Sequence, residues 1–438
     1  MANILILGHH LTSVLNGGLS IARRLKRKGH TVRMVGVPDV EEKITKQGFD
    51  YRPFLAGVYP KGRLEALEKA ESSGFPPLKR LKQDMLDEVA AFQGGDLARA
   101  VDGFRPELVI GCADHPQGVI AAAKLGVPVV DYLTKPYSIE KHGEPPLGSP
   151  LVPEAGLGYR VKNYLAWRGA LVPQAIMMRV LMRLDYQQHF RDYASQMGFD
   201  PAKVHFDADY NLVRLEVPHL VLWPQKLEFP RAQAIPDLHY LESSADVDRA
   251  PDAGFSWDGV DPAKPLVYCS LGVTGTFVHP GRLRQIFGTF LEAMTARPQW
   301  QGMLSVGEHE DITKLEVPAN VRVYTRVPQI DVLKRAAVFV TQGGAVSLGE
   351  AFTLGVPMVL VPLFFDQWGL AARVAFHGLG VRASESQDVK AGALTSAIER
   401  ILGDASYKGR ATAMAASIRD LESQDRTATV VESFLVRH

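Results

Sequence analysis

Short apolar runs alternate with amphipathic segments from the N-terminus onward. Residues 4–7 are apolar and end at a glycine, a pattern that predicts a buried strand. Residues 19–28 have helical spacing with a basic end, and residues 31–35 predict the next strand. A strand, a helix and a strand within about 35 residues form a βαβ unit, which requires a parallel sheet. The same order returns at 108–110, 118–125 and 127–131.

The second half of the chain repeats this order. We therefore expect an α/β fold of two doubly wound, Rossmann-like domains that face each other across a cleft. In such sheets ligands bind beyond the carboxyl ends of the strands. Strands are predicted at 266–271, 302–306, 321–324, 338–341 and 358–361, and helices at 282–294 and 345–352.

Three prolines interrupt residues 223–244, where little regular pattern is visible, and we predict that this segment is the linker. It separates an N-terminal domain, residues 1–222, from a C-terminal domain, residues 245–422. Residues 423–438 are expected to hold a last helix, at 427–436, that packs back toward the N-terminal domain.

Composition narrows the class of protein. The chain has 438 residues, 46% of them hydrophobic and 22% charged, with a net charge of +1. These values are typical of a globular protein and disfavour nucleic acid as a partner. The two cysteines, Cys112 and Cys269, cannot build a disulfide framework or a zinc site. We expect a cytoplasmic protein, with neither a signal peptide nor a membrane span.

The segment around Gln342 carries the clearest chemical pattern. Gly343 and Gly344 follow a predicted strand, and Ser347 lies at the start of a predicted helix. Exposed backbone N–H groups and the helix dipole favour an anion at such a position. Glu350 lies about one turn further on, where its carboxylate can accept hydrogen bonds from the two hydroxyls of a ribose.

A second polar pair follows the next predicted strand. Asp366 and Gln367 offer acceptors and an amide donor, which suit the neighbouring hydroxyls of a pyranose. Glycines and prolines also punctuate ordinary βα loops, so a purely structural role is the alternative for both segments.

These segments together resemble the UDP-glycosyltransferase superfamily, which has the GT-B fold. Its C-terminal signature is His-x-Gly-x-x-Ser-x-x-Glu-Ala, followed by Gly-Val-Pro, then Pro and Asp-Gln. The N-terminal half is similar to zeaxanthin glucosyltransferases and their bacterial relatives, for example at Tyr59-Pro60-Lys61-Gly62. The signature positions here are Gln342, Gly344, Ser347, Glu350, Ala351, Gly355, Val356, Pro357, Pro362, Asp366 and Gln367.

The resemblance implies an inverting, metal-independent transfer of a hexose from a nucleoside diphosphate sugar, with UDP-glucose expected, and no further cofactor. The acceptor would be a small lipophilic molecule such as a terpenoid, carotenoid, polyketide or phenol, bound by the N-terminal domain. Arg326 stands where the family stacks a tryptophan on the base, and Gln342 stands where it has a histidine. The expected donor residues are Gly272, Thr274, Arg326, Gln329, Gln342, Gly343, Gly344, Ser347, Glu350, Asp366 and Gln367.

The expected catalytic histidine is missing. A gapless comparison puts Val14 in its position, so the base must come from elsewhere. His10 is our first candidate and His9 the second, with Asp114 to orient either imidazole. The alternative for each is a local structural role. An acceptor that ionises easily, such as a phenol or a carboxylic acid, would make a strong base unnecessary.

Two other functions remain open. The chain could be a weak or inactive homologue that binds a nucleotide sugar or a lipophilic ligand, although the intact Asp366 and Gln367 favour an enzyme. The signature argues against sugar-nucleotide epimerisation. We expect a monomer or a homodimer. The basic run at 23–28 fits a solvated helix end, or an anionic membrane surface as the less favoured alternative. Met177, Met178 and Met182 suit either a core or an acceptor pocket.

Overall fold

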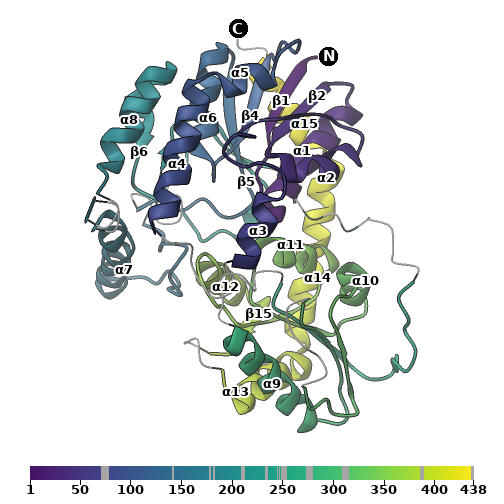
Figure 1. Cartoon of the computed structure of the whole chain (residues 1–438). Helices are drawn as coiled ribbons and strands as arrows, with labels where there is room; N and C mark the ends of the chain where they lie inside the picture. Colours follow the sequence, from purple (N-terminus) through teal and green to yellow (C-terminus); the bar gives the residue numbers. More distant parts are fainter. Residues whose placement is uncertain are drawn as a thin grey trace.

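The computed structural model contains two parallel sheets, one above the other in Figure 1. Each sheet has helices packed against it, so the expected α/β architecture of two Rossmann-like domains is confirmed. The structure describes residues 1–70, 78–140, 143–176, 179–180, 183–208, 213–231, 235–243, 245, 247, 254–272, 280–307, 315–384 and 389–435.

The first sheet has the strand order β3-β2-β1-β4-β5-β8-β9 in the described residues. Its chain order reverses beside β1, which creates a crevice between the loops after β1 and β4. The strands are β1 Asn3–Leu7, β2 Thr31–Gly36, β3 Asp50–Pro53, β4 Leu108–Cys112, β5 Val129–Leu133, β8 His219–Val221 and β9 Leu238–Tyr240, beside a hairpin of β6 Val204–His205 and β7 Arg214–Leu215. The helices are α1 Thr12–Arg27, α2 Glu41–Thr45, α3 Arg63–Ala70, α4 Leu78–Gln93, α5 Asp96–Ala100, α6 Pro116–Ala122, α7 Leu157–Ile176 and α8 Tyr186–Met197.

The second sheet has the order β12-β11-β10-β13-β14-β15 over the part of the chain that is described, so its reversal lies between β10 and β13. Its strands are β10 Leu266–Ser270, β11 Gln301–Ser305, β12 Val321–Tyr324, β13 Val338–Thr341, β14 Met358–Leu360 and β15 Gly380–Arg382. The helices are α9 Pro280–Thr295, α10 Gln329–Leu333, α11 Ala345–Leu354, α12 Gln367–Phe376, α13 Ala391–Gly403, α14 Ala405–Ser423 and α15 Arg426–Leu435.

The segment between the two sheets is more regular than its prolines indicate. Strand β9 lies inside residues 223–244 and pairs in parallel with β8 at the edge of the first sheet. The expectation of little regular structure there is therefore wrong for Leu238–Tyr240. The prolines lie outside this strand, so they do not interrupt its hydrogen bonds. The boundaries of the linker stay a prediction.

The last helix, α15, lies beside α1 of the first half, which Figure 1 shows in yellow and purple. Its N-terminus is capped by Glu242, a fully buried carboxylate that accepts hydrogen bonds from the backbone N–H groups of Arg426 and Thr427. Val431 and Phe434 then enter the hydrophobic core of the first sheet. The chain thus returns to its first half after completing the second.

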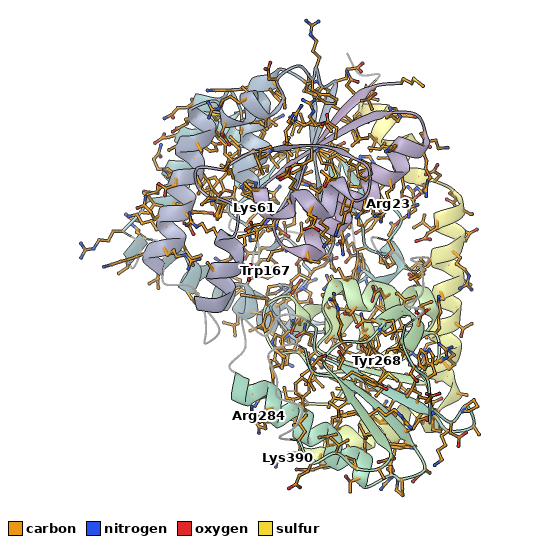
Figure 2. All side chains as sticks on the ribbon, turned by 45° about the vertical axis from the view of Figure 1, so that its right-hand side comes forward. Arg23, Lys61, Trp167, Tyr268, Arg284 and Lys390 are labelled. Atoms are coloured by element: carbon orange, nitrogen blue, oxygen red, sulfur yellow. The ribbon has the colours of Figure 1, made fainter. Side chains whose placement is uncertain are left out.

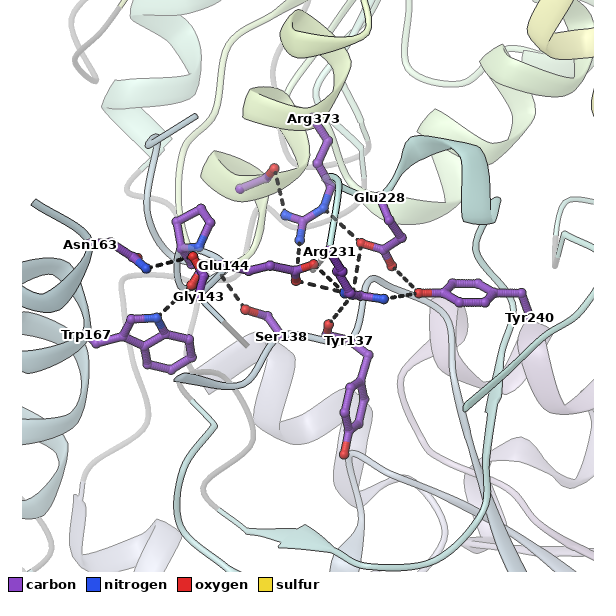
Figure 3. A network of polar contacts seen from close by, with 12 residues as sticks. Tyr137, Ser138, Gly143, Glu144, Asn163, Trp167, Glu228, Arg231, Tyr240 and Arg373 are labelled. Atoms are coloured by element: carbon purple, nitrogen blue, oxygen red, sulfur yellow. Dashed lines mark hydrogen bonds and ion pairs between the residues drawn. The ribbon is translucent and has the colours of Figure 1, made fainter. Parts of the chain in front are cut away.

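A cluster of four charged side chains joins the two halves (Figure 3). Glu144 comes from the loop after β5, Glu228 and Arg231 from the connecting segment, and Arg373 from α12. We call these four residues the junction cluster. Arg231 donates to Glu144, and Arg373 donates to Glu228 over 3.3 Å. Two carboxylates thus face two guanidinium groups inside the protein. Arg373 has no exposed surface.

A close backbone contact lies beside this cluster. Gly369 is in the first turn of α12, and its N–H donates to the carbonyl oxygen of Leu147, 2.7 Å away, from the first half. First-turn N–H groups lack a partner within their own helix, so this bond satisfies one of them. A Cβ on residue 369 would lie only 2.4 Å from the same oxygen, so glycine is required there.

Helix α7 contacts this junction from the side. Trp167 donates from its indole N–H to the carbonyl of Glu144 at 2.8 Å, and Figure 2 shows it near the level where the two halves meet. The helix has 20 residues. No helix in the described parts of the chain is long and apolar enough to cross a membrane.

The glycine contact gives a test of the junction. We expect Gly369→Ala to lower the free energy of unfolding by about 1–3 kcal/mol, because the added methyl group overlaps the Leu147 carbonyl. The matched control is Gly288→Ala in α9, where an added Cβ meets nothing within 4 Å. That change should be neutral or stabilising by up to about 1 kcal/mol. Urea unfolding curves of both variants measure the difference, and equal stabilities would contradict the close contact.

Candidate active site

The N-terminus of α11 forms the base of the donor half of the site. The chain leaves β13 at Thr341, turns at Gly343 with a φ of +87°, and enters α11 after Gly344. Gly344 has no side chain with which to cap the helix. The first-turn N–H groups therefore point toward the cleft end of the sheet, a suitable environment for a diphosphate. The left-handed turn at residue 343 favours glycine.

The loop after β10 touches this turn. Gly272 also has a left-handed backbone, with a φ of +71°, and a Cβ there would lie 2.6 Å from Nε2 of Gln342. The Gln342 side chain is buried between the two loops. The structure thus brings together Gly272, Gln342 and Gly343 as the sequence predicts. Thr274 lies outside the described residues.

Three more predicted donor residues meet one turn along α11. Gln329, at the start of α10, donates from Nε2 to Glu350 Oε2 at 2.5 Å and to Ser347 Oγ at 3.3 Å. Its amide oxygen accepts a bond of 3.0 Å from the hydroxyl of Tyr268 on β10. Tyr268 was not expected from the sequence, where it is one apolar strand position among several. Gln329 therefore fixes the Glu350 carboxylate at the floor of the site.

Arg326 lies in the loop between β12 and α10 and is exposed. It precedes Gln329 by three residues, so it belongs to the same rim of the second sheet. A planar guanidinium at this rim can stack on a flat ring.

The loop before α12 carries the second predicted pair. Oε1 of Gln367 accepts backbone N–H bonds from Leu363 at 2.9 Å and Phe364 at 3.2 Å. The loop also holds Phe365 at a φ of +50°. The expectation that the whole Gln367 amide reads a sugar needs correction, because its oxygen is used inside the loop. Its NH₂ group and the half-buried Asp366 carboxylate are the groups that suit a ligand.

The acceptor half begins with two adjacent histidines after β1. The rings of His9 and His10 stack with their centroids 4.3 Å apart. Nδ1 of His9 accepts the backbone N–H of Leu11 at 3.0 Å, so its neutral ring carries the proton on Nε2. Burial, His10 and His115 all lower the pKa of His9 well below its usual value. With its only lone pair engaged, His9 is a poor candidate for the base.

His10 is more open. Its side chain is exposed to solvent on one side, yet crowding by protein atoms and the neighbouring His115 lower its pKa to about 4. Glu88 opposes this effect. His10 is consequently neutral at pH 7 and able to accept a proton, but it is a weaker base than the unperturbed histidine assumed from the sequence.

Glu88 is the carboxylate that interacts with these histidines, and it was not predicted from the sequence. It lies on α4 and is 8% exposed. It accepts a bond from the Tyr59 hydroxyl at 2.6 Å and pairs with Nε2 of His115 at 3.1 Å. Burial acts to raise its pKa, but His115 and Tyr59 outweigh this and lower it. Helix α4 carries three carboxylates among several other charged residues. Only tertiary packing distinguishes Glu88 from the other two.

Asp114 does not orient either predicted histidine. Its carboxylate pairs with Nζ of Lys135 at 2.7 Å, a side chain that is almost fully buried. The expected Asp114–histidine pair is therefore replaced by Glu88–His115 on one side and Asp114–Lys135 on the other. The Asp114–Lys135 pair forms because the loops after the neighbouring strands β4 and β5 lie at the same edge of the sheet, and the Glu88–His115 pair forms because α4 packs beside the loop after β4.

Val14 occupies a core position rather than an empty catalytic slot. It lies in the first turn of α1, is 5% exposed, and packs within the apolar core of the first sheet. Its carbonyl accepts a bond of 3.2 Å from the Tyr132 hydroxyl. An imidazole at this position would be buried among apolar groups.

Comparison with known proteins agrees with this geometry. The family model of UDP-glucoronosyl and UDP-glucosyl transferase matches residues 186–438. The chain belongs to this family. The match covers the whole donor half, including the N-terminus of α11 and the loop before α12.

Relatives and solved structures extend the likeness over the rest of the chain. The chain is 31% identical to NDP-glycosyltransferase YjiC of Bacillus subtilis (strain 168) over 39% of its own length and 42% of that relative. It is 22% identical to zeaxanthin glucosyltransferase of Pantoea ananas over 95% of this chain and 92% of the relative. The structure of the glycotransferase of kitacinnamycin superposes with a TM-score of 0.74 at 23% identity, covering 99% and 98% of the two chains. The fold is thus GT-B.

The two donor loops can be tested with a pair of glycines. We expect Gly272→Ala to weaken binding of UDP, because the new Cβ displaces the Gln342 amide. Gly307→Ala is the control: it has a similar φ of +82° after β11, but a Cβ there meets nothing within 4 Å. Both variants should lose about 1–2 kcal/mol of stability through the left-handed backbone. Calorimetric titration separates them, and equal UDP affinities would contradict a donor role for the Gly272 loop.

Proposed function

We propose that this chain transfers a hexose from a nucleoside diphosphate sugar, with UDP-glucose as our first choice, to a hydroxyl group of a small lipophilic acceptor. The observation that carries the proposal is the Gln329–Ser347–Glu350 cluster one turn inside the N-terminus of α11. A fixed carboxylate beside an anion-binding helix end matches a ribose attached to a diphosphate. Family membership supports the same assignment.

Each part of the donor has a matching group. The diphosphate would lie on the N–H groups after Gly344, with the Gln342 amide beside it, and Glu350 would accept from the ribose hydroxyls. Arg326 would stack on the base. Asp366 and the Gln367 NH₂ group would bind the hexose, since an ideal Cβ on Gly343 comes within 3.8 Å of the Gln367 carbonyl, which places the two loops side by side.

The reaction would be a single in-line displacement. The acceptor oxygen forms a bond to the anomeric carbon while the bond from that carbon to the diphosphate oxygen breaks, so the anomeric configuration inverts. The negative charge that develops on the leaving diphosphate is stabilised by the N–H groups of α11. The proton of the acceptor hydroxyl passes to a base on the side of the first sheet.

His10 is our proposed base. It is neutral at pH 7 and exposed toward solvent, whereas the Nδ1 atom of His9 is already engaged. A pKa of about 4 makes proton transfer from an aliphatic alcohol unfavourable, so His10 suits an acceptor of lower pKa. We therefore favour a phenol or another acidic hydroxyl over an aliphatic alcohol.

A groove beside the hexose loop fits a lipophilic acceptor. It has a volume of about 420 Å³ and reaches from α7 to Phe365, next to Asp366. This volume is within the usual range for small-molecule sites. The relatives include a zeaxanthin glucosyltransferase, which supports an apolar acceptor. The groove is lined by Pro146, Gly148, Ser149, Pro150, Ala166, Gly169, Ala170 and Phe365.

A second candidate function is donor binding with little turnover. The buried Val14 favours it, because the position that holds the base in the family is apolar here. Multiple-turnover assays with a panel of phenols and alcohols separate the two functions. Release of one equivalent of UDP per acceptor glycosylated supports the enzyme, and binding of UDP-glucose without turnover supports the second candidate.

The donor assignment predicts that two carboxylates act on different parts of the same ligand. Glu350→Gln should weaken binding of free UDP by about 1.5–3 kcal/mol, because it removes a charge-assisted hydrogen bond to the ribose. Asp366→Asn should leave UDP binding unchanged but lower the rate of hexose transfer. Calorimetry with UDP and initial rates with UDP-glucose test both. If Asp366→Asn loses as much UDP affinity as Glu350→Gln, the division between ribose and hexose is wrong.

The proposed base predicts a pH profile. A base works in its neutral form, so kcat/KM should fall as pH drops through about 4, the pKa of His10. His10→Ala should lower turnover by about 10²-fold and abolish this limb. His205→Ala is the control, since that histidine pairs with Glu216 on the β6–β7 hairpin. A fall of kcat/KM at a pH of about 6.5 would instead indicate a histidine of unperturbed pKa.

A further inference from the structure

Helix α7 presents an unusual amount of apolar surface. In the described part of the chain, large apolar side chains are exposed at thirteen positions, and seven of these lie between residues 157 and 180. Leu157 and Leu165 are 76% and 60% exposed. Such high exposure is unusual for leucines of a helix that packs on a protein core. The seven are Leu157, Val161, Tyr164, Leu165, Val172, Ile176 and Val180.

These side chains form a continuous stripe. At 100° per residue, the six that belong to α7 fall within an arc of about 120°. The opposite face is the buried one: Trp167 and Asn163 donate to the carbonyls of Glu144 and Gly143 at 2.8 and 2.9 Å (Figure 3). The stripe is therefore not the face by which α7 packs on the protein. Figure 1 shows the helix at the left-hand edge of the molecule.

The charge around the stripe has one sign. Between Glu154 and Asp185 the chain has five basic residues and no acidic residue. Arg160 and Lys162 flank the stripe on its two sides and are exposed. Arg168 pairs with Glu140, so the exposed positive charge of this segment comes from the other four basic residues. The exposed basic residues are Arg160, Lys162, Arg179 and Arg183.

We propose that α7 docks this chain on the surface of an anionic lipid bilayer. The apolar stripe would lie at the boundary between headgroups and acyl chains, while Arg160 and Lys162 contact lipid phosphates. A helix with a basic polar face and an apolar stripe is the usual form of such an anchor. A second copy of the chain fits less well, because a two-fold contact through α7 would bring the basic residues beside the two stripes together.

The groove beside α7 is continuous with this surface. Gly169 lines the groove and is exposed at the margin of the stripe, and the far end of the groove is Phe365. On a bilayer, the mouth of the groove would face the lipid, where a lipophilic molecule is concentrated. The docking requires no glycosyl transfer, so it can be tested independently of the proposed activity.

Vesicle co-sedimentation of the full chain tests the docking. We expect binding to vesicles of phosphatidylcholine mixed with phosphatidylglycerol, weak binding to phosphatidylcholine alone, and release by added salt, which screens the basic residues. Val161→Ser combined with Leu165→Ser should lower the partition coefficient by about tenfold or more. Arg160→Gln combined with Lys162→Gln should lower it on the anionic vesicles alone.

Leu81→Ser is the matched control, because Leu81 is an exposed leucine of α4, outside the stripe, and this variant should bind like the wild type. All substituted positions are exposed, so the variants should keep the unfolding midpoint of the wild type, which urea titration verifies. Absence of binding to anionic vesicles overturns the proposal, as does equal binding by the stripe variants. A wild-type dimer that the stripe variants convert to a monomer in sedimentation velocity would assign the surface to a second copy instead.

Discussion

The arrangement of the whole molecule depends on the junction cluster of Glu144, Glu228, Arg231 and Arg373. Two carboxylates and two guanidinium groups are taken out of water where the halves meet, and each group is tolerable there only because the others are present. Removing one partner from such a cluster leaves a buried charge without compensation, at a cost of about 3–5 kcal/mol. The two halves are therefore held in one relative position by charge, in addition to apolar contacts such as Trp223 against Phe352.

This junction connects the parts of the site to one another. Arg373 belongs to α12, the helix that starts at Gln367, so one helix joins the junction cluster to the loop that we propose binds the hexose. Glu144 belongs to the loop on which α7 rests through Trp167. The loop before α12, the groove and α7 are consequently all connected to the junction cluster. A change in the separation of the two sheets would alter all three together.

Local patterns predicted most of the sheet strands and the donor half, because those features are written in consecutive residues. Short apolar runs gave most of the strands within one or two residues, and the spacing from Gln342 to Gln367 gave the two loops that we propose bind the donor. The acceptor half was harder. Glu88 and His115 are 27 residues apart and meet only through packing of α4 beside the sheet. Asp114 pairs with Lys135 because the loops after the paired strands β4 and β5 lie side by side. Strand β9 was missed because three prolines precede it within 15 residues and its own pattern is only three residues long.

The capping of α15 by Glu242 has a consequence for how the protein is made. The first half of the chain leaves the ribosome first, and domains generally fold in that order. Here the core of the first sheet includes Val431 and Phe434, which are synthesised after all the strands of the second sheet. The N-terminal half therefore cannot complete its core until the second half has been translated and folded. Until then, the apolar surface of α1 that α15 covers stays exposed. The domain that starts first is completed last.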